Sequence, residues 1–217
     1  MKSQYRYWSI CQGLLLGLVA GACASYTYAN PVGYVLKVEL SPAVCKIDSS
    51  QKRTRQCLEG YSLSVAGLYP QHAAPQNCET SSLWALTPVQ KRVLMRIMPD
   101  ENSQARLWRQ VGGCVAMNAN QYFRLMVNYA ERLNMPEELS SPTTLRMNKE
   151  WLQQRLIKQN KGLTEQNFQL SCARSDSRSN LFLTTIKVCY QNNGRYKTCQ
   201  AESQGACPEQ FMIQGSY

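Results

Sequence analysis

Histidine is almost absent from this chain: His72 is the only one in 217 residues. Acid–base catalysis by a pair of imidazoles needs two histidines, because one accepts a proton while the other donates one. The composition therefore excludes that mechanism. His72 follows Pro70 in a polar segment, and no Ser-His-Asp or Cys-His nucleophile motif includes it. We expect His72 to have a structural or solvated role.

The chain also lacks a CxxC pair. Zinc sites usually combine such pairs with histidines, so we expect no metal ion and no other cofactor. Ten cysteines are present, and Cys11 and Cys23 fall within the first 29 residues. The remaining cysteines are Cys45, Cys57, Cys78, Cys114, Cys172, Cys189, Cys199 and Cys207. This even number predicts four disulfides formed in an oxidising compartment.

Residues 1–29 have the pattern of a signal peptide. Lys2 and Arg6 come first, and the apolar core of residues 10–24 is too short to span a bilayer comfortably. Cleavage before Asn30 would leave one mature domain, 30–217, without a transmembrane segment. We expect a periplasmic or secreted bacterial protein. Lipoprotein anchoring at Cys23 is the alternative.

Basic residues outnumber acidic ones by 24 to 14. Removal of the signal, with Lys2 and Arg6, leaves 22 against 14. Such an excess suits phosphates, anionic membrane surfaces or an acidic protein partner, and does not choose among them. The chain could also be a basic protein that binds no polyanion. We expect it to be a monomer.

The hydrophobic periodicity predicts one α+β domain with helices packed on a sheet. Apolar and polar residues alternate, as in strands, over 33–40, 61–65, 164–172 and 181–190. Helical spacing covers 86–98, 104–111, 120–133 and 143–160. We expect Pro42 to end the first strand, residues 67–70 to end the second, and Asn192-Asn193-Gly194 to form a hairpin turn. Loops are expected at 46–56, 71–80 and 198–217.

Several motifs together resemble a known family. They are an opening strand ending in Ser-Pro and Cys (38–45), LSVAGLYP (63–70), Met98-Pro99, RLWRQVGGC (106–114) and Tyr122-Phe123. In this order they are similar to the first strand, the two catalytic segments and the following helix of the ribonuclease T2 family of secreted acid endoribonucleases. The resemblance implies a ribonuclease T2-like α+β fold, with a central antiparallel sheet and packed helices. It also implies the disulfides Cys45–Cys57, Cys78–Cys114, Cys172–Cys207 and Cys189–Cys199.

The positions that carry catalysis in that family are occupied here by other residues. The family segments read His-Gly-Leu-Trp-Pro and His-Glu-Trp-x-Lys-His-Gly-Thr-Cys, and they act in the transphosphorylation of RNA. The first histidine falls on Ala66. The His, Glu, Lys and second His of the other segment fall on Arg106, Leu107, Gln110 and Val111. The residues that match are those that shape the backbone and core: Gly67, Leu68, Pro70, Trp108, Gly112 and Cys114.

The resemblance thus implies a degenerate member without catalytic residues. We expect it to act by binding RNA or a protein partner, in a regulatory, inhibitory or immunity-type role. Tyr69, Arg106, Trp108 and Arg109 are the candidate contacts, although Trp108 is more typical of a core residue. Leu107 and Val111 would lie one helical turn apart and would penalise a phosphate at the old centre.

Two other functions stay open. The chain could be a residual endoribonuclease that uses Arg106, Gln110 and His72, or a structural component of the cell envelope. A basic helix face, formed by Lys149, Arg155, Lys158 and Lys161, could contact RNA or simply be solvated.

Overall fold

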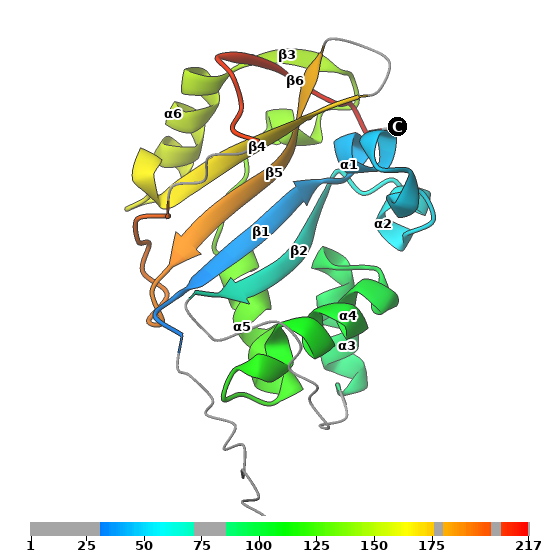
Figure 1. Ribbon diagram of the computed structural model, residues 1–217, viewed down its shortest axis with the longest axis vertical. Coiled ribbons are helices and arrows are strands. Elements are labelled where there is room, and N and C mark those ends of the chain that lie inside the picture. Colours follow the sequence, from blue (N-terminus) through cyan, green and yellow to red (C-terminus); the bar gives the residue numbers. More distant parts are fainter. Residues whose placement is uncertain (1–30, 72–85, 176–179, 201–204, 217) are drawn as a thin grey trace, which may run out of the picture.

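The computed structural model describes residues 31–71, 86–175, 180–200 and 205–216 (Figure 1). The strands are β1 (Tyr34–Leu40), β2 (Leu63–Pro70), β3 (Leu145–Asn148), β4 (Phe168–Arg174), β5 (Leu181–Tyr190) and β6 (Gln210–Ile213). The helices are α1 (Ser41–Ile47), α2 (Arg55–Leu58), α3 (Pro88–Ile97), α4 (Glu101–Gln110), α5 (Ala119–Glu131) and α6 (Lys149–Gln159). Short 3-10 turns are η1 (Ser49–Gln51), η2 (Gly112–Cys114), η3 (Glu137–Ser140) and η4 (Glu165–Asn167).

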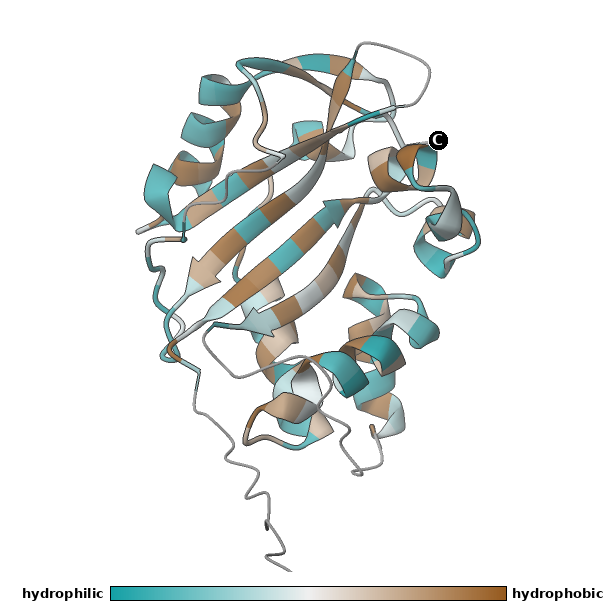
Figure 2. Ribbon diagram, viewed as in Figure 1, coloured by the Kyte–Doolittle hydropathy of each residue, from teal (hydrophilic) through white to brown (hydrophobic). Residues whose placement is uncertain are grey.

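The sheet is built around β5, which pairs antiparallel with both β1 and β4. Strand β2 extends the sheet antiparallel to β1. Strand β6 joins β5 through the parallel pair Phe182–Met212 and carries β3 on its other side. Hydrophobic and hydrophilic residues alternate along β1 (Figure 2), because its two faces meet different surroundings. Tyr34, Leu36, Val38 and Leu40 are buried on one face.

Helix α5 anchors the helical layer to the sheet. The Tyr122 hydroxyl, fully buried, donates to the backbone carbonyl of Leu68 in β2 at 2.6 Å. The Trp108 ring of α4 packs against α5, with its centroid 6.0 Å from that of Tyr122 and 6.3 Å from that of Phe123. The turn of residues 112–114 also packs tightly against Trp108, because a Cβ on Gly112 would lie 2.7 Å from the Trp108 ring. The core therefore fixes α4 relative to β2.

Most elements lie where the periodicity predicts them. The exposed Val89 departs from the pattern, with 66% of its surface accessible although it belongs to the apolar positions of α3. The predicted turn at Asn192-Asn193-Gly194 is present, and the Gly194 amide donates to the Gln191 carbonyl at 2.9 Å.

The prediction of a loop over residues 46–56 was wrong. Helix α1 runs to Ile47, and η1 and α2 follow it. A proline in the first turn starts α1 with a suitable φ, and the Asp48 carboxylate accepts from the Ser50 amide at 2.9 Å to begin η1. Local hydrogen bonds thus produce short helices that carry too little apolar periodicity to be seen in the sequence.

The prediction of one helix over residues 143–160 was also wrong. Residues 145–148 form β3, and Asn148 caps α6 by accepting from the Trp151 amide at 2.9 Å. Strand β3 pairs with β6, so the tail over residues 198–217, expected to be loop-like, contains a strand. Strand β2 likewise continues through Gly67 to Pro70, where the sequence suggested its end.

Three of the four expected disulfides are present: Cys45–Cys57, Cys172–Cys207 and Cys189–Cys199. Cys114 is disulfide-bonded, and its expected partner Cys78 lies outside the described residues, as do residues 1–29 and His72. In the described ranges, no helix is long and apolar enough to cross a membrane.

The Cys45–Cys57 bridge gives a first testable prediction. It closes a segment with a sequence separation of 12 residues. We expect the double variant Cys45→Ser/Cys57→Ser to lose about 2–4 kcal/mol of unfolding free energy in urea titrations. The exposed substitution Arg53→Ala, within the same segment, should change it by no more than about 0.5 kcal/mol. Equal stability of the double variant and the native protein would contradict a structural role for this bridge.

Candidate functional site

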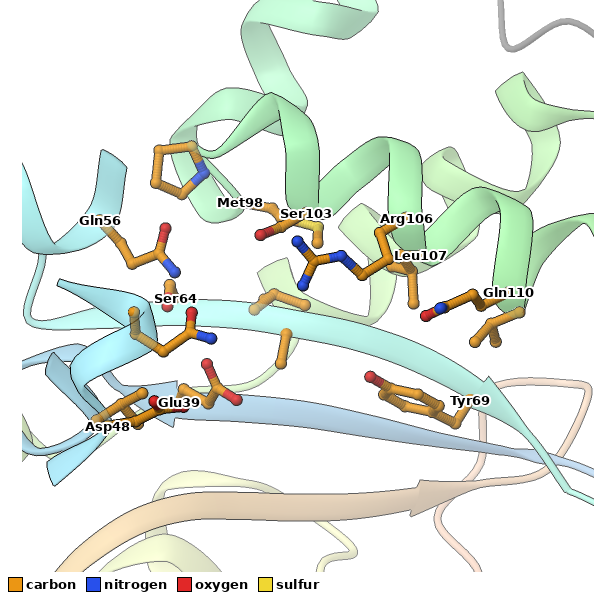
Figure 3. Close-up of a pocket in the computed structure, with 16 residues that line it drawn as sticks. Glu39, Asp48, Gln56, Ser64, Tyr69, Met98, Ser103, Arg106, Leu107 and Gln110 are labelled. Atoms are coloured by element: carbon orange, nitrogen blue, oxygen red, sulfur yellow. The ribbon is translucent and has the colours of Figure 1, made fainter. Parts of the chain in front are cut away.

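A cleft of about 230 Å³ opens between α4 and the outer strands of the sheet (Figure 3). Helix α4 lines it with Ser103, Arg106, Leu107 and Gln110. These residues are spaced by three or four positions and therefore share one face of the helix. Trp108 lies on another face and is buried in the core. The amphipathic pattern of α4 thus decides which side chains the cleft receives.

The start of α4 is fixed by two polar contacts. Asp100 is the N-cap and accepts from the Ser103 amide at 2.7 Å. The buried Gln104 side chain donates to the Met98 carbonyl at 2.5 Å. Met98 and Pro99 themselves line the cleft. The helix therefore enters the site at a defined angle.

Strand β2 forms the opposite wall and contains a β-bulge. Lys37 pairs with Gly67 and Val38 with Val65, so Ala66 has no partner in the register. A bulge commonly turns a side chain away from the ordinary alternation, and Ala66 lines the cleft beside Val65. The next residue, Gly67, lets the wall approach α4, because a Cβ there would lie 2.7 Å from the Leu107 Cδ1 atom.

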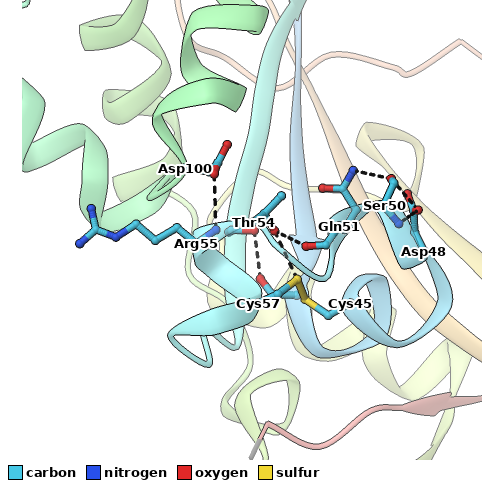
Figure 4. Close-up of a disulfide and its surroundings, with 10 residues drawn as sticks. Cys45, Asp48, Ser50, Gln51, Thr54, Arg55, Cys57 and Asp100 are labelled. Carbon is cyan, nitrogen blue, oxygen red and sulfur yellow. Dashed lines mark hydrogen bonds between the residues drawn. A yellow bond between two sulfur atoms is a disulfide. The ribbon is translucent and has the colours of Figure 1, made fainter.

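The segment closed by the Cys45–Cys57 bridge forms the third wall (Figure 4). It contributes Asp48, Gln51 and Gln56. The Arg55 backbone amide donates to the Asp100 carboxylate at 3.4 Å, which connects this wall to the cap of α4. The Asp48 carboxylate accepts from the Ser50 hydroxyl and amide, and these hydrogen bonds lower its pKa.

Glu39 of β1 lies on the floor of the cleft, and its carboxylate points into it (Figure 3). Burial raises the pKa of Glu39, Lys37 lowers it, and Asp48 raises it further. Within the described part of the chain, no ion pair or side-chain hydrogen bond reaches this carboxylate. Arg106 extends toward the interior from the other side (Figure 3).

The cleft brings together all five positions that the resemblance assigns to lost catalytic residues. Ala66, Arg106, Leu107, Gln110 and Val111 all line it. Among the residues that α4 contributes, Leu107 is buried, whereas Arg106 and Gln110 are exposed.

Of the four candidate binding residues, Tyr69 and Arg106 line the cleft, whereas Trp108 and Arg109 do not. Tyr69 lines the cleft, half-buried, with the Lys37 ammonium 5.5 Å from its ring centroid. Burial raises the pKa of the Tyr69 hydroxyl, and Glu39 raises it further. Arg109 is exposed outside the cleft lining. Trp108 is only 2% exposed, so it is a core residue and cannot stack on a ligand.

Sequence reasoning missed six other polar residues that line the cleft. They are Glu39, Asp48, Gln51, Gln56, Ser64 and Ser103. Glu39 carried a usable signal, since it is the one acidic residue of the first strand and occupies its polar face. The short helices η1 and α2, which bring Gln51 and Gln56 to the cleft, have no such signal.

The basic face of α6 is partly neutralised by the protein itself. Arg155 pairs with Glu138 at 2.8 Å, and its guanidinium carbon lies 5.2 Å from the ring centroid of Trp151. Lys158 is exposed and Lys149 half-buried, while the exposed Lys161 lies beyond the end of α6 at Gln159 and so does not belong to the helix face, contrary to the prediction. This face is therefore a weaker candidate for nucleic acid than an unpaired basic stripe.

No family profile matches the chain, and no curated protein does. Solved structures do match. Ribonuclease MC1 from bitter gourd seeds superposes with a TM-score of 0.62 at 18% identity, covering 82% of this chain and 98% of the other. The self-incompatibility-associated SF11 ribonuclease of Nicotiana alata gives 0.64 at 12% identity, with coverages of 84% and 99%. Ribonuclease NT in complex with 5'-AMP gives 0.63 at 15% identity, with coverages of 85% and 97%.

These likenesses define a disulfide-containing α+β protein with a ribonuclease fold. The fold is ribonuclease T2-like, as the sequence motifs predicted.

The raised pKa of Glu39 gives a prediction about stability. The folded protein binds the proton of the Glu39 carboxyl group more tightly than the unfolded chain does. Protonation of Glu39 therefore stabilises the fold fully below the ordinary pKa of 4.5, and this stabilisation is lost as the pH rises through the raised pKa. Charged Glu39 therefore opposes folding at neutral pH. We expect Glu39→Gln to raise the melting temperature at pH 7, and this gain should disappear in acid.

The exposed Glu209→Gln substitution serves as the control and should leave the melting temperature unchanged at both pH values. A lower melting temperature for Glu39→Gln at pH 7 would show that the carboxylate is paired in solution.

Proposed function

We propose that the chain is an exported ribonuclease T2-like protein that acts by binding and does not cleave RNA. The observation that carries the proposal is the meeting of Ala66, Arg106, Leu107, Gln110 and Val111 in one cleft. The coincidence supports the assignment of these residues to the family's catalytic positions. The site is thus retained as a shape, while its chemistry differs.

None of these five side chains can transfer a proton near neutral pH. Arginine stays protonated, the glutamine amide does not titrate, and Ala66, Leu107 and Val111 are apolar. The nearby Tyr69 hydroxyl is a weaker acid than usual, because burial raises its pKa. A general base and a general acid each contribute roughly 10²–10⁴ in rate, so losing both removes most of the catalysis.

Charge at the centre also opposes phosphoryl chemistry. A phosphodiester in the cleft would approach the Glu39 carboxylate, and like charges at short range disfavour each other in a half-buried site. Arg106 would offset only part of this repulsion. The apolar side chains of Leu107 and Val111 would in addition remove water from the phosphate without replacing its hydrogen bonds.

The ligand is proposed to be RNA held without cleavage or a protein held in the cleft, consistent with a regulatory, inhibitory or immunity-type role. The overall basic charge and the exposed Arg106 and Arg109 support RNA at the rim. Ribonuclease NT is solved with 5'-AMP, and a variant of ribonuclease MC1 with 5'-UMP. The disulfides support the predicted signal peptide and a periplasmic or secreted location.

A residual endoribonuclease is the second candidate. The observation that favours it is Glu39, because a carboxyl group with a raised pKa in a cleft is a candidate general base. This residue adds to the Arg106, Gln110 and His72 set that the sequence offers.

Labelled RNA tests the two candidates. We expect no turnover above the protein-free control when disulfide-intact protein is incubated from about pH 4 to pH 8, because the described cleft has no acid–base pair. Cleavage that is lost in His72→Ala or in Glu39→Gln would establish the enzyme instead. The Glu209→Gln protein controls for a contaminating nuclease, since contaminant activity would persist in all variants.

A gain-of-function variant tests the assignment of the positions. We expect Ala66→His alone to create no RNA cleavage, because one imidazole cannot both accept and donate the protons. The matched comparison combines Ala66→His with Arg106→His, Leu107→Glu, Gln110→Lys and Val111→His. Turnover from Ala66→His alone would show that the other four positions are wrongly assigned.

A further inference from the structure

One end of the cleft presents hydrogen-bond acceptors that lack donors. The Gln56 side chain is only 8% exposed, and its Oε1 atom has no hydrogen-bond partner among the described residues. The Glu39 carboxylate lines the same space and is also unpartnered in that part of the chain. Ser64 lies between them, and its hydroxyl already accepts from Ser41 at 3.0 Å (Figure 3). A buried acceptor without a donor destabilises the free protein, and a ligand that brings a donor to it would remove this cost.

These acceptors are held in place by separate elements. Glu39 is paired within the sheet to Ser64 on one side and to Thr185 on the other. Gln56 belongs to α2, which the Cys45–Cys57 bridge and the hydrogen bond from the Tyr61 amide to the Gln56 carbonyl, 3.0 Å long, hold to the rest of the fold. The acceptors are therefore arranged before any ligand arrives, which lowers the entropy cost of binding.

The charge of this end selects a cation. Glu39 and Asp48 both line it, and Asp48 raises the pKa of Glu39, as expected of two neighbouring carboxylates. Arg106 lies within the same cleft but forms no ion pair with either carboxylate. A group that carries positive charge and several N–H donors would satisfy Glu39 and Gln56 together.

We infer that the Glu39–Gln56 end of the cleft is a subsite for the guanidinium of an arginine side chain presented by a protein partner. The inference rests on the proposed function and selects the protein partner over RNA. A planar guanidinium has five donors and can bond acceptors that approach from different elements. The aliphatic stem would lie along Val65 and Leu107, which line the same cleft.

Binding should depend on pH through Glu39. A cation favours the charged carboxylate, so affinity should rise as the pH increases through the pKa of Glu39 and fall in acid. The other charged or titratable groups around Glu39 are Lys37 on the same strand, Lys187 on the neighbouring strand β5, Asp48, Tyr69 and Arg106.

The experiment titrates the mature, disulfide-intact protein with the peptide acetyl-Gly-Arg-Gly-amide. Its matched control replaces arginine by citrulline, which has the same shape without the charge. We expect the arginine peptide to bind at least about tenfold more tightly and to shift the Gln56 side-chain amide resonances in NMR spectra. Glu39→Gln should reduce the affinity by about tenfold or more, Gln56→Met should also weaken it, and Glu209→Gln should leave it unchanged.

Other probes distinguish the sources of a cation and the other class of ligand. Spermidine that binds as well as the peptide would identify a free polyamine and overturn the protein assignment. Equal affinity for the citrulline peptide, or unchanged affinity in Glu39→Gln, would overturn the subsite. The third probe is 5'-UMP or single-stranded RNA. If either binds the Glu39→Gln protein more tightly than the arginine peptide binds the native protein, the cleft is assigned to nucleic acid.

The two proposals fail separately. RNA cleavage by the same preparation would refute the proposed function whatever the peptide result. Absence of both cleavage and arginine-dependent binding would overturn only the subsite.

Discussion

The position of the cleft depends on the close approach of β2 to α4 at Gly67. A Cβ on this residue would lie 2.7 Å from the Leu107 Cδ1 atom, so the missing side chain leaves the space that the buried Leu107 occupies. On the core side, the buried Tyr122 hydroxyl bonds the Leu68 carbonyl and fixes the same strand to α5. Neither contact involves a group that transfers protons. The shape of the cleft is therefore independent of catalysis.

This independence explains how apolar residues can occupy the cleft without loss of the fold. Leu107 packs against the strand and is almost fully buried, so it contributes hydrophobic burial where a charged residue would need a partner. Val111 and Ala66 likewise need no hydrogen bonds. Glu39 is the exception among the residues of this site, because it keeps a carboxylate where burial opposes its charge. A residue that opposes stability is a stronger indication of function than the apolar residues around it.

The sequence predicts the elements whose apolar periodicity is long enough. Residues 33–40 alternate over a full strand, and α5 carries a continuous apolar face, so both are found close to their observed bounds. The family motifs find two walls of the cleft, β2 through Ala66 and α4 through Arg106. Other features depend on tertiary contacts or are very short: the bulge at Ala66 is set by pairing with β1, β3 pairs with β6, and α2 has four residues. Such features leave no periodic signal in the chain.

The overall charge and the charge of the cleft act at different distances. The chain carries a formal net charge of +10, which attracts acidic surfaces from afar, but this attraction decays over a screening length of about 8–10 Å at physiological salt. Inside the cleft, the nearest charged groups dominate, and Glu39 and Asp48 are among the residues that line it. A nucleic acid would be attracted by the overall positive charge, but inside the cleft its phosphates would meet the two carboxylates. A protein surface that is acidic overall and projects one arginine suits both the overall charge and the cleft. Its net charge favours encounter, and its arginine side chain fits the cleft.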